Sequence, residues 1–235
     1  MKLISDNNFE NSKLKLVFSS LADGNVGDKN VTASVLSARN EFFAKWALSG
    51  KKLILAEQVH GQEIALVNKQ SDDIQLGVYA LITKDENLIL AIRTADCVPV
   101  LLADEENKVI AAVHAGWRGV AGEIVIKTVA QMLELGAEKN KIKAFVGPHI
   151  RSCCFEIKAD ILSNFKNFES AVITREGKLF LDLEGLLDQQ LASVGIANEN
   201  IFSATDCTCC SEKYYSWRGQ DNVLTGEQLS IISLL

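Results

Sequence analysis

The chain has 235 residues and a formal net charge of −6, with 48% hydrophobic and 23% charged residues. This length allows one large domain or two small ones with a sizeable core, and the composition excludes a disordered chain. A net negative charge without a basic tail makes nucleic-acid binding an unfavoured function. The N-terminal "MKLISDNNFENSK" contains no apolar signal segment, and no apolar run is long enough to span a membrane. We therefore expect a cytoplasmic protein that binds neither nucleic acid nor membranes.

Taken in chain order, the apolar pattern predicts strands and helices in a mixed sequence. Strands are predicted over 13–20, 52–60, 63–68, 78–84, 88–94, 97–103, 109–116 and 141–150, with short ones near Val172, Phe180 and Ile201 and a terminal one over 228–235. Helices are predicted over 32–48, 122–135, 154–168 and 182–195. No repeat or linker interrupts this order, so we expect a single α+β domain over residues 1–235, with mixed sheets covered by helices.

One segment, "TADCVPVLLADEENKVIAAVHAGWRG" from Thr94 to Gly119, brings a thiol, an imidazole and a guanidinium close together in the sequence. Two apolar runs flank the polar stretch Asp104 to Lys108, which is typical of a hairpin. A turn there pairs residues whose numbers sum to about 211, so Cys97 and His114 are predicted to face each other. Directly opposed residues have Cβ atoms roughly 4.5 to 5.5 Å apart, close enough to share a metal ion or a proton.

A second histidine extends this pair, because His60 ends another predicted strand in "QVHG". One thiolate and two imidazoles form a donor set that suits Zn²⁺, and three protein ligands leave the fourth tetrahedral position open, as in catalytic zinc sites. The sequence therefore predicts Zn²⁺ on His60, Cys97 and His114, where it can activate water. Burial of the three as ordinary core side chains is the alternative.

The segment "HAGWRGVAG" predicts an anion site directly after His114. Glycines at 116, 119 and 122 leave backbone amides accessible, and the N-terminus of the following helix adds partial positive charge. Arg118 can donate two parallel hydrogen bonds to a phosphate. We expect Gly116, Arg118 and Gly119 to bind phosphate, the alternative being a tight turn without a ligand.

Two further positions are candidates for the same site. Asp96, beside the thiol, is predicted to orient a ligand histidine or to transfer a proton, unless it only caps a turn. In "YYSWRG" (Tyr214 to Gly219), Arg218 and its aromatic neighbours are candidates for a wall against a heterocycle, although aromatic residues near a terminal strand commonly belong to the core. The predicted catalytic set is therefore Asp96, Cys97, His114 and Arg118.

The remaining cysteines fall into two clusters. Cys153 adjoins Cys154, and "CTCC" contains Cys207, Cys209 and Cys210. In a reducing compartment we do not expect these thiols to form disulfides. The Cys207-x-x-Cys210 spacing together with the other pair could complete a structural zinc site, but the sequence does not set their separation, and simple burial is the alternative.

The motifs "QVHG", "TADCVPVLL", "VHAGWRG", "GPHI" with "CCFEI", and "CT" with "YYSWR" together resemble the YfiH-like family, whose members are commonly described as laccase-domain or polyphenol-oxidase-like proteins. The resemblance runs from Leu53 to the C-terminus. It implies an α+β fold related to that of cytotoxic necrotising factor toxins, and a zinc ion on His60, Cys97 and His114. A true multicopper laccase is rejected, because only His149 remains beyond these ligands.

The resemblance also implies phosphorolysis of purine nucleosides (adenosine, inosine and methylthioadenosine), with adenosine deaminase activity alongside. The expected ligands are therefore Zn²⁺, phosphate and a purine nucleoside. Three alternatives stay open: an amidase-like hydrolase that edits peptidoglycan precursors, a metal-free thiol hydrolase that uses Cys97 and His114, and a binding protein that keeps zinc for structure. The sequence does not specify an oligomeric state.

Three positions depart from the family pattern. "SSLADGNVGD" replaces the usual SLNLG-like segment and its upstream Arg, Tyr79 stands where Asp is usual, and Glu227 stands where Arg is usual. The predicted metal ligands are unchanged. The departures therefore bear on the substrate and its turnover.

Overall fold

Two large β-sheets face each other in the computed structural model, which describes residues 2–3, 8–11, 13–58, 63–165, 171–221, 223 and 225–235. The seven-stranded sheet has the order β1 (Lys2–Leu3), β15 (Ile201–Ser203), β11 (Lys143–Val146), β9 (Val98–Asp104), β10 (Val109–Ala115), β7 (Val78–Thr83) and β5 (Glu63–Leu66). The six-stranded sheet has the order β2 (Asn8–Glu10), β3 (Leu14–Phe18), β16 (Gln228–Leu234), β8 (Leu88–Thr94), β4 (Lys52–Glu57) and β6 (Ile74–Leu76).

Strand alternation builds a core on each face of the seven-stranded sheet. In β10, Ile110 and Ala112 pack toward the six-stranded sheet, whereas Ala111 and Val113 pack toward the helices. Because successive side chains of a strand point to opposite faces, a continuous apolar run such as "VIAAV" indicates a strand buried on both sides. All five of these residues are fully buried.

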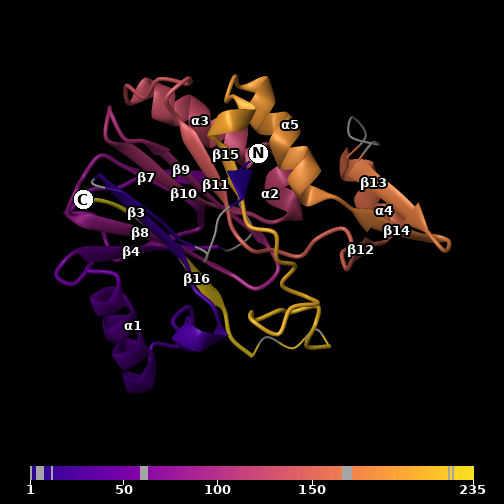
Figure 1. The fold of residues 1–235 in the computed structure, drawn as a ribbon, viewed down its shortest axis with the longest axis horizontal. Helices are drawn as coiled ribbons and strands as arrows, with labels where there is room; N and C mark the ends of the chain where they lie inside the picture. Colours follow the sequence, from indigo (N-terminus) through magenta and orange to yellow (C-terminus); the bar gives the residue numbers. More distant parts are fainter. Residues whose placement is uncertain are drawn as a thin grey trace.

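Helices cover the outer faces of both sheets, giving four layers (Figure 1). Helix α1 (Ala33–Lys45) covers the six-stranded sheet, and the Thr32 side chain caps it by accepting from the Val35 N–H. The seven-stranded sheet is covered by α2 (Trp117–Ala121), α3 (Ile124–Glu134) and α5 (Leu183–Ser193). None of the helices in the described part of the chain has the length and apolar character needed to span a bilayer.

A smaller three-stranded sheet lies to one side of these layers, at the right of Figure 1. Its order is β12 (Glu156–Ile157), β14 (Lys178–Leu181) and β13 (Val172–Arg175), and α4 (Ala159–Leu162) follows β12. Within the described residues, 3-10 turns lie at Leu21–Asp23, Ser163–Phe165 and Asn198–Asn200.

The predicted α+β class and most predicted elements are confirmed, but the helix predicted over 154–168 is wrong. The N–H groups of Cys154 and Phe155 both donate to the carbonyl of Arg151, which makes a turn there, and Glu156 then pairs with Phe180 in β12. Only α4 and the 3-10 turn after it are helical before residue 166, where the described segment ends. The prediction also omitted the short strands β1, β2 and β6 and the short helix α2.

The predicted register of the β9–β10 hairpin is wrong by two residues. His114 pairs with Pro99 and Val109 with Asp104, so Cys97 does not lie directly opposite His114. The turn is centred one residue later than predicted, because the Asp104 side chain accepts from the N–H groups of Glu106 and Asn107 and holds a four-residue loop. Since side chains alternate with a period of two, this shift leaves both side chains on the predicted common face.

Candidate functional site

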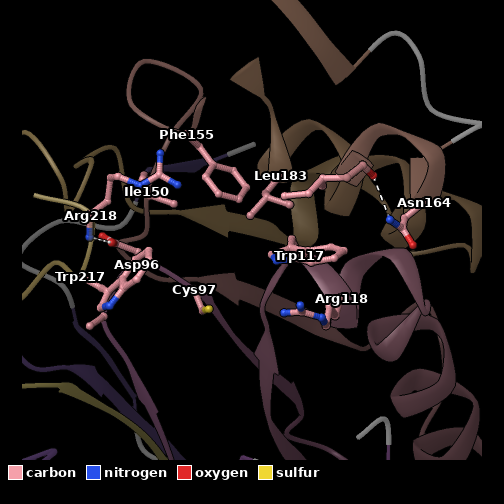
Figure 2. Close-up of a pocket in the computed structure, with 12 residues that line it drawn as sticks. Asp96, Cys97, Trp117, Arg118, Ile150, Phe155, Asn164, Leu183, Trp217 and Arg218 are labelled. Atoms are coloured by element: carbon pink, nitrogen blue, oxygen red, sulfur yellow. Dashed lines mark hydrogen bonds between the residues drawn. The ribbon is translucent and has the colours of Figure 1, made fainter. Parts of the chain in front are cut away.

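A cavity of about 680 Å³ lies where the β8–β9 connection meets the start of α2 (Figure 2). Its lining comes from six separate parts of the chain: residues 95–97, α2, residues 150–155, residues 161–164, the start of α5, and residues 217–218. Cys97, Arg118, Asp96 and Arg218, four of the predicted site residues, line it together.

Cys97 lines this cavity and meets His114 around Gly116, two residues that are not part of the lining; we call Cys97, His114 and Gly116 the base of the cavity. A Cβ atom on residue 116 would lie 3.0 Å from the Cys97 sulfur and 3.3 Å from His114 Nε2. The two donor atoms thus converge on one point that only a glycine leaves open. The predicted proximity of Cys97 and His114 therefore exists, as a diagonal pair rather than a directly opposed one.

The other ring nitrogen of His114 is held by the six-stranded sheet. Nδ1 lies 3.0 Å from the carbonyl oxygen of Arg93 and 2.5 Å from Nε2 of Gln58. Gln58 is itself fixed, because its amide donates to the Arg93 carbonyl and accepts from the Arg93 N–H. The two contacts belong to different tautomers: with the proton on Nδ1 this atom donates to the Arg93 carbonyl, and with the proton on Nε2 it accepts from the Gln58 amide. The first tautomer leaves the lone pair of Nε2 directed at the gap beside Cys97, and it is the one that a metal requires.

Both donors are uncharged at neutral pH in the absence of a cation. Burial raises the pKa of the Cys97 thiol to about 12, and the nearby carboxylates of Asp96 and Glu227 contribute to the rise. Burial lowers the pKa of His114 to about 4. A protonated thiol beside a neutral imidazole is a poor nucleophile, because the thiolate is the reactive form.

These two side chains fit a metal ion, since a soft sulfur and an imidazole nitrogen with a free lone pair approach the same point. His60, the third predicted ligand, lies outside the described residues. Tyr79 packs edge-on against the His114 ring, with 5.5 Å between ring centroids. Tyr79 therefore supports the position of the imidazole.

Asp96 holds the C-terminal segment against the base of the cavity. One carboxylate oxygen accepts from the Thr208 hydroxyl at 2.7 Å, and the other accepts from the Arg218 N–H at 2.6 Å. Its backbone is left-handed, with φ of 91°, and its carbonyl accepts from the Ile150 N–H. The predicted contact between Asp96 and a ligand histidine is not among the hydrogen bonds of the described residues, and the carboxylate instead connects three loops.

The predicted phosphate residues separate into exposed and buried ones. The Arg118 guanidinium lies 4.2 Å from the centroid of the Trp117 ring and is exposed at the cavity (Figure 2). Gly119 is buried, and a Cβ there would meet Ile124 and the His114 carbonyl, so Gly119 serves the packing of α2 rather than an anion. The five-residue α2 lies between this loop and α3, which is the helix predicted over 122–135.

Arg218 lies on the opposite side of the cavity from Arg118 (Figure 2). Its guanidinium donates to the Glu156 carbonyl at 3.1 Å and lies 5.8 Å from the centroid of the Phe155 ring. Trp217 beside it has 44% of its surface exposed, more than a core tryptophan would have. Of the aromatic residues predicted to form a wall with Arg218, Trp217 lines the cavity, whereas Tyr214 is buried and donates to Asp206.

Sequence reasoning missed three residues that shape the site: Gln58, Trp117 and Phe155. Gln58 belongs to the motif QVHG, which contains His60, and Trp117 directly precedes Arg118 in VHAGWRG. Their places in these motifs could have indicated that both residues belong to the site. Glu227, the unusual acidic residue, lies 3.7 Å from the Arg93 guanidinium, where its charge also acts on Cys97.

Comparison with known proteins places these features in one family. The chain is 33% identical over 233 residues to the purine nucleoside phosphorylase of Clostridium acetobutylicum, covering 95% of this chain and 93% of that protein. It is 30% identical over 190 residues to adenosine deaminase RL5 from an unknown prokaryotic organism, covering 75% and 72%. The crystal structure of the hypothetical protein YfiH of Bacillus licheniformis matches with a TM-score of 0.85 and 25% identity, over 94% of this chain and 93% of that one.

The resemblance to YfiH-like proteins is therefore confirmed. A family model described as multi-copper polyphenol oxidoreductase laccase matches residues 15–235. The chain contains three histidines, which are too few for the copper centres in that description. With nearly its whole length matched, the chain belongs to the family described as multi-copper polyphenol oxidoreductase laccase.

Proposed function

We propose that this chain is a nucleoside-processing enzyme, and specifically a metal-dependent purine nucleoside phosphorylase. The observation that carries the proposal is the convergence of Cys97 sulfur and His114 Nε2 at the base of a cavity walled by aromatic rings and two arginines. The relatives named purine nucleoside phosphorylase and adenosine deaminase support the same class of substrate.

In this proposal the metal is Zn²⁺, held by Cys97 and His114 together with His60, whose part rests on the sequence. When bound, the ion supplies a Lewis acid at the base of the cavity. The neutral His114 imidazole is ready to bind, while the Cys97 thiol must lose its proton, which a cation at this point favours. A thiol hydrolase needs a Cys97 thiolate, and a protonated thiol beside a neutral imidazole weighs against that alternative.

The cavity walls supply binding groups for both substrates. The rings of Trp117 and Phe155 present apolar faces on which a purine can stack. Arg118 makes no ion pair with the described residues, so its guanidinium is available for phosphate, and Arg218 offers a second positive charge across the cavity. Phosphate and the ribose of the nucleoside would then meet between the two arginines.

The reaction exchanges one bond at the anomeric carbon. An oxygen of hydrogen phosphate forms a bond to C1′ of the ribose as the bond from C1′ to the purine nitrogen breaks. The purine leaves with the electron pair and receives the proton of hydrogen phosphate, giving ribose 1-phosphate and the free base. Arg118 and Arg218 stabilise the phosphate throughout, while the aromatic walls keep the base aligned.

Deamination of adenosine is a second candidate, favoured by the match to adenosine deaminase RL5. That reaction consumes water, replaces the exocyclic amino group of the base by oxygen, and releases ammonia. It requires no phosphate, so the two activities are distinguished by their co-substrate.

The test is incubation of zinc-loaded protein with adenosine, with and without phosphate, followed by chromatography of the bases and nucleosides. We expect adenine to appear only with phosphate, whereas inosine without phosphate would assign deamination. Absence of both products at every metal loading would contradict the nucleoside proposal and favour the cell-wall precursor hydrolase or the binding protein.

Arg118→Met sharpens this test by removing the charge that is proposed to bind phosphate. We expect kcat/KM for phosphate to fall about 10-fold or more, because KM for phosphate rises while kcat changes little. Lys45→Met is a matched control, because Lys45 also lies over an indole ring, that of Trp46, but on α1 and outside the cavity. Equal kinetics of both variants would argue against a phosphate site at Arg118.

A further inference from the structure

Four cysteines from two distant segments form a cluster apart from the Cys97 and His114 pair. Cys153 and Cys154 come from the turn before β12, and Cys207 and Cys210 come from the segment after β15. Their sulfur atoms all lie within 4.8 Å of one another, and the Cys153 and Cys210 sulfurs are 3.9 Å apart. We call these four residues the cysteine cluster.

The sulfur spacing fits a tetrahedral metal site and does not fit disulfides. Zinc–sulfur bonds of about 2.3 Å place the sulfurs of a tetrahedral site about 3.8 Å apart, near the distance between Cys153 and Cys210. A disulfide needs about 2.05 Å, and all six cysteines are free thiols. Four sulfur donors in this arrangement select a thiophilic tetrahedral ion, of which Zn²⁺ is the common structural example.

A backbone amide beside Cys207 provides a second, independent observation. The Arg151 N–H donates to the Cys207 sulfur at 3.4 Å. A backbone N–H donor on a sulfur stabilises the thiolate, which is the form that binds metals. Cys207 is buried while Cys153 and Cys210 are exposed, so an ion can enter from the surface.

The surroundings also provide charge for a site with four thiolates. Arg175 donates to the Ser152 carbonyl, directly beside Cys153, and its guanidinium lies over the Phe180 ring. This bond holds a positive side chain beside the Cys153 backbone, and a positive charge near the site would oppose the repulsion among four thiolates. Cys209 lies between two members of the cluster in sequence and its side chain contacts Cys154, but it is not one of the four cysteines whose sulfurs all lie within 4.8 Å of one another.

We propose that Cys153, Cys154, Cys207 and Cys210 bind a structural Zn²⁺ ion, separate from the ligands at the base of the cavity. The ion would join two walls of that cavity, because Phe155 follows the first cysteine pair and Arg218 follows the second. The two segments already approach through the parallel bridge between His149 and Cys207. A metal at the cluster would add a further link between two segments that this bridge and the hydrogen bond from the Arg151 N–H to Cys207 already join.

Metal content tests the proposal directly. Protein purified under a thiol reductant and dialysed exhaustively is analysed for zinc per chain by mass spectrometry. We expect the Cys153→Ala/Cys210→Ala variant to hold one zinc fewer per chain than the unmodified protein, and Cys209→Ala to hold the same amount. The two removed side chains are exposed, so little apolar burial is lost with them.

Cobalt gives a readout that does not depend on comparing amounts. When Co²⁺ is added to metal-free Cys97→Ala protein, we expect the charge-transfer and visible absorption bands of tetrahedral thiolate coordination. The midpoint temperature of thermal unfolding should rise by several degrees. Equal zinc in the double variant and the unmodified protein, a cobalt spectrum without thiolate bands, or a Cys153–Cys210 disulfide under reductant would each overturn the proposal. Because none of these readouts uses a nucleoside, failure of the proposed enzymatic function leaves them unaffected.

Discussion

The cavity base and the cysteine cluster are both sets of soft donors, but they are built in opposite ways. Cys97 and His114 belong to one hairpin, whose strands are buried on both faces and fix the side chains through the sheet. In the cluster, Cys153 and Cys210 are 57 residues apart, and both stand on turns. A rigid hairpin can hold an open site for chemistry, whereas turns that meet only in the folded chain gain most from a closed, structural ion.

The largest effect is expected from Cys97→Ala, which removes a donor from the cavity base only. Activity should fall about 100-fold or more, because the Lewis acid is lost with its ligand. One zinc per chain should disappear, while the cluster retains its own. Kinetics and zinc analysis of the same preparation check both parts, and loss of both ions would contradict the independence of the two regions.

Gly116→Ala should weaken the cavity site without removing a donor. The added Cβ would lie 3.0 Å from the Cys97 sulfur and 3.3 Å from His114 Nε2, in the gap where an ion is proposed to bind. The backbone is unstrained for alanine, with φ of −65°, so the effect comes from the methyl group. We expect zinc affinity at this site to fall about 10- to 100-fold in a competition assay with a chelator.

Gly119→Ala is the matched control for this substitution. Its Cβ would meet Ile124 and a backbone carbonyl rather than the donor atoms, so zinc affinity should stay unchanged. A similar loss of zinc in both variants would show that Gly116 acts through the packing of α2.

A smaller effect is expected where the two regions are joined, in Thr208→Val. The buried Thr208 hydroxyl donates to the Asp96 carboxylate at 2.7 Å, and valine keeps the shape but removes the bond. The free energy of unfolding should fall by about 2 kcal/mol, as measured by urea denaturation, with both ions retained. Thr225→Val removes an exposed hydroxyl and should change the free energy of unfolding little. If this variant lost as much stability as Thr208→Val, the bond to Asp96 would have no special role.

The smallest effect is expected outside both regions, at Asp188 on α5. Burial raises the pKa of Asp188 to about 6, and the nearby charges of Glu184 and Asp182 add to the rise. The folded protein then holds a proton between pH 3.8 and about 6 that the unfolded chain has lost, so this group makes stability fall as pH rises through that window.

Asp188→Asn should therefore stabilise the protein at pH 7, by about 0.5 to 1 kcal/mol after allowing for solvent exposure of the group. Thermal unfolding at pH 4, 5, 6 and 7 checks this, since the advantage of the variant should grow up to pH 6 and then level off. An advantage independent of pH would assign the effect to packing.

Much of the fold and part of the site follow from local sequence patterns. The alternation in β10 predicts a strand buried on both faces, and the glycine after His114 indicates a close approach. The prediction that Cys97 and His114 lie on the same face of the hairpin is correct although the predicted register is not. A shift of two residues leaves a side chain on the same face of a strand.

The rest depends on contacts that no local pattern contains. The helix predicted over 154–168 fails because Arg151 makes a turn there and Glu156 pairs with Phe180 in β14, which comes later in the chain. The role of Asp96 depends on Thr208 and Arg218, more than a hundred residues away in sequence. The cysteine cluster likewise forms only when two turns are brought together by the parallel pairing of β11 with β15.

The measurement that tests the central claim most directly is phosphate-dependent release of adenine from adenosine by metal-loaded protein, compared with Cys97→Ala under the same conditions. We predict adenine and ribose 1-phosphate in equal amounts from the unmodified protein, and a loss of about 100-fold or more in the variant together with one zinc per chain. Equal adenine release by both proteins, or none from the fully metal-loaded protein, would contradict a metal-dependent nucleoside site at Cys97 and His114.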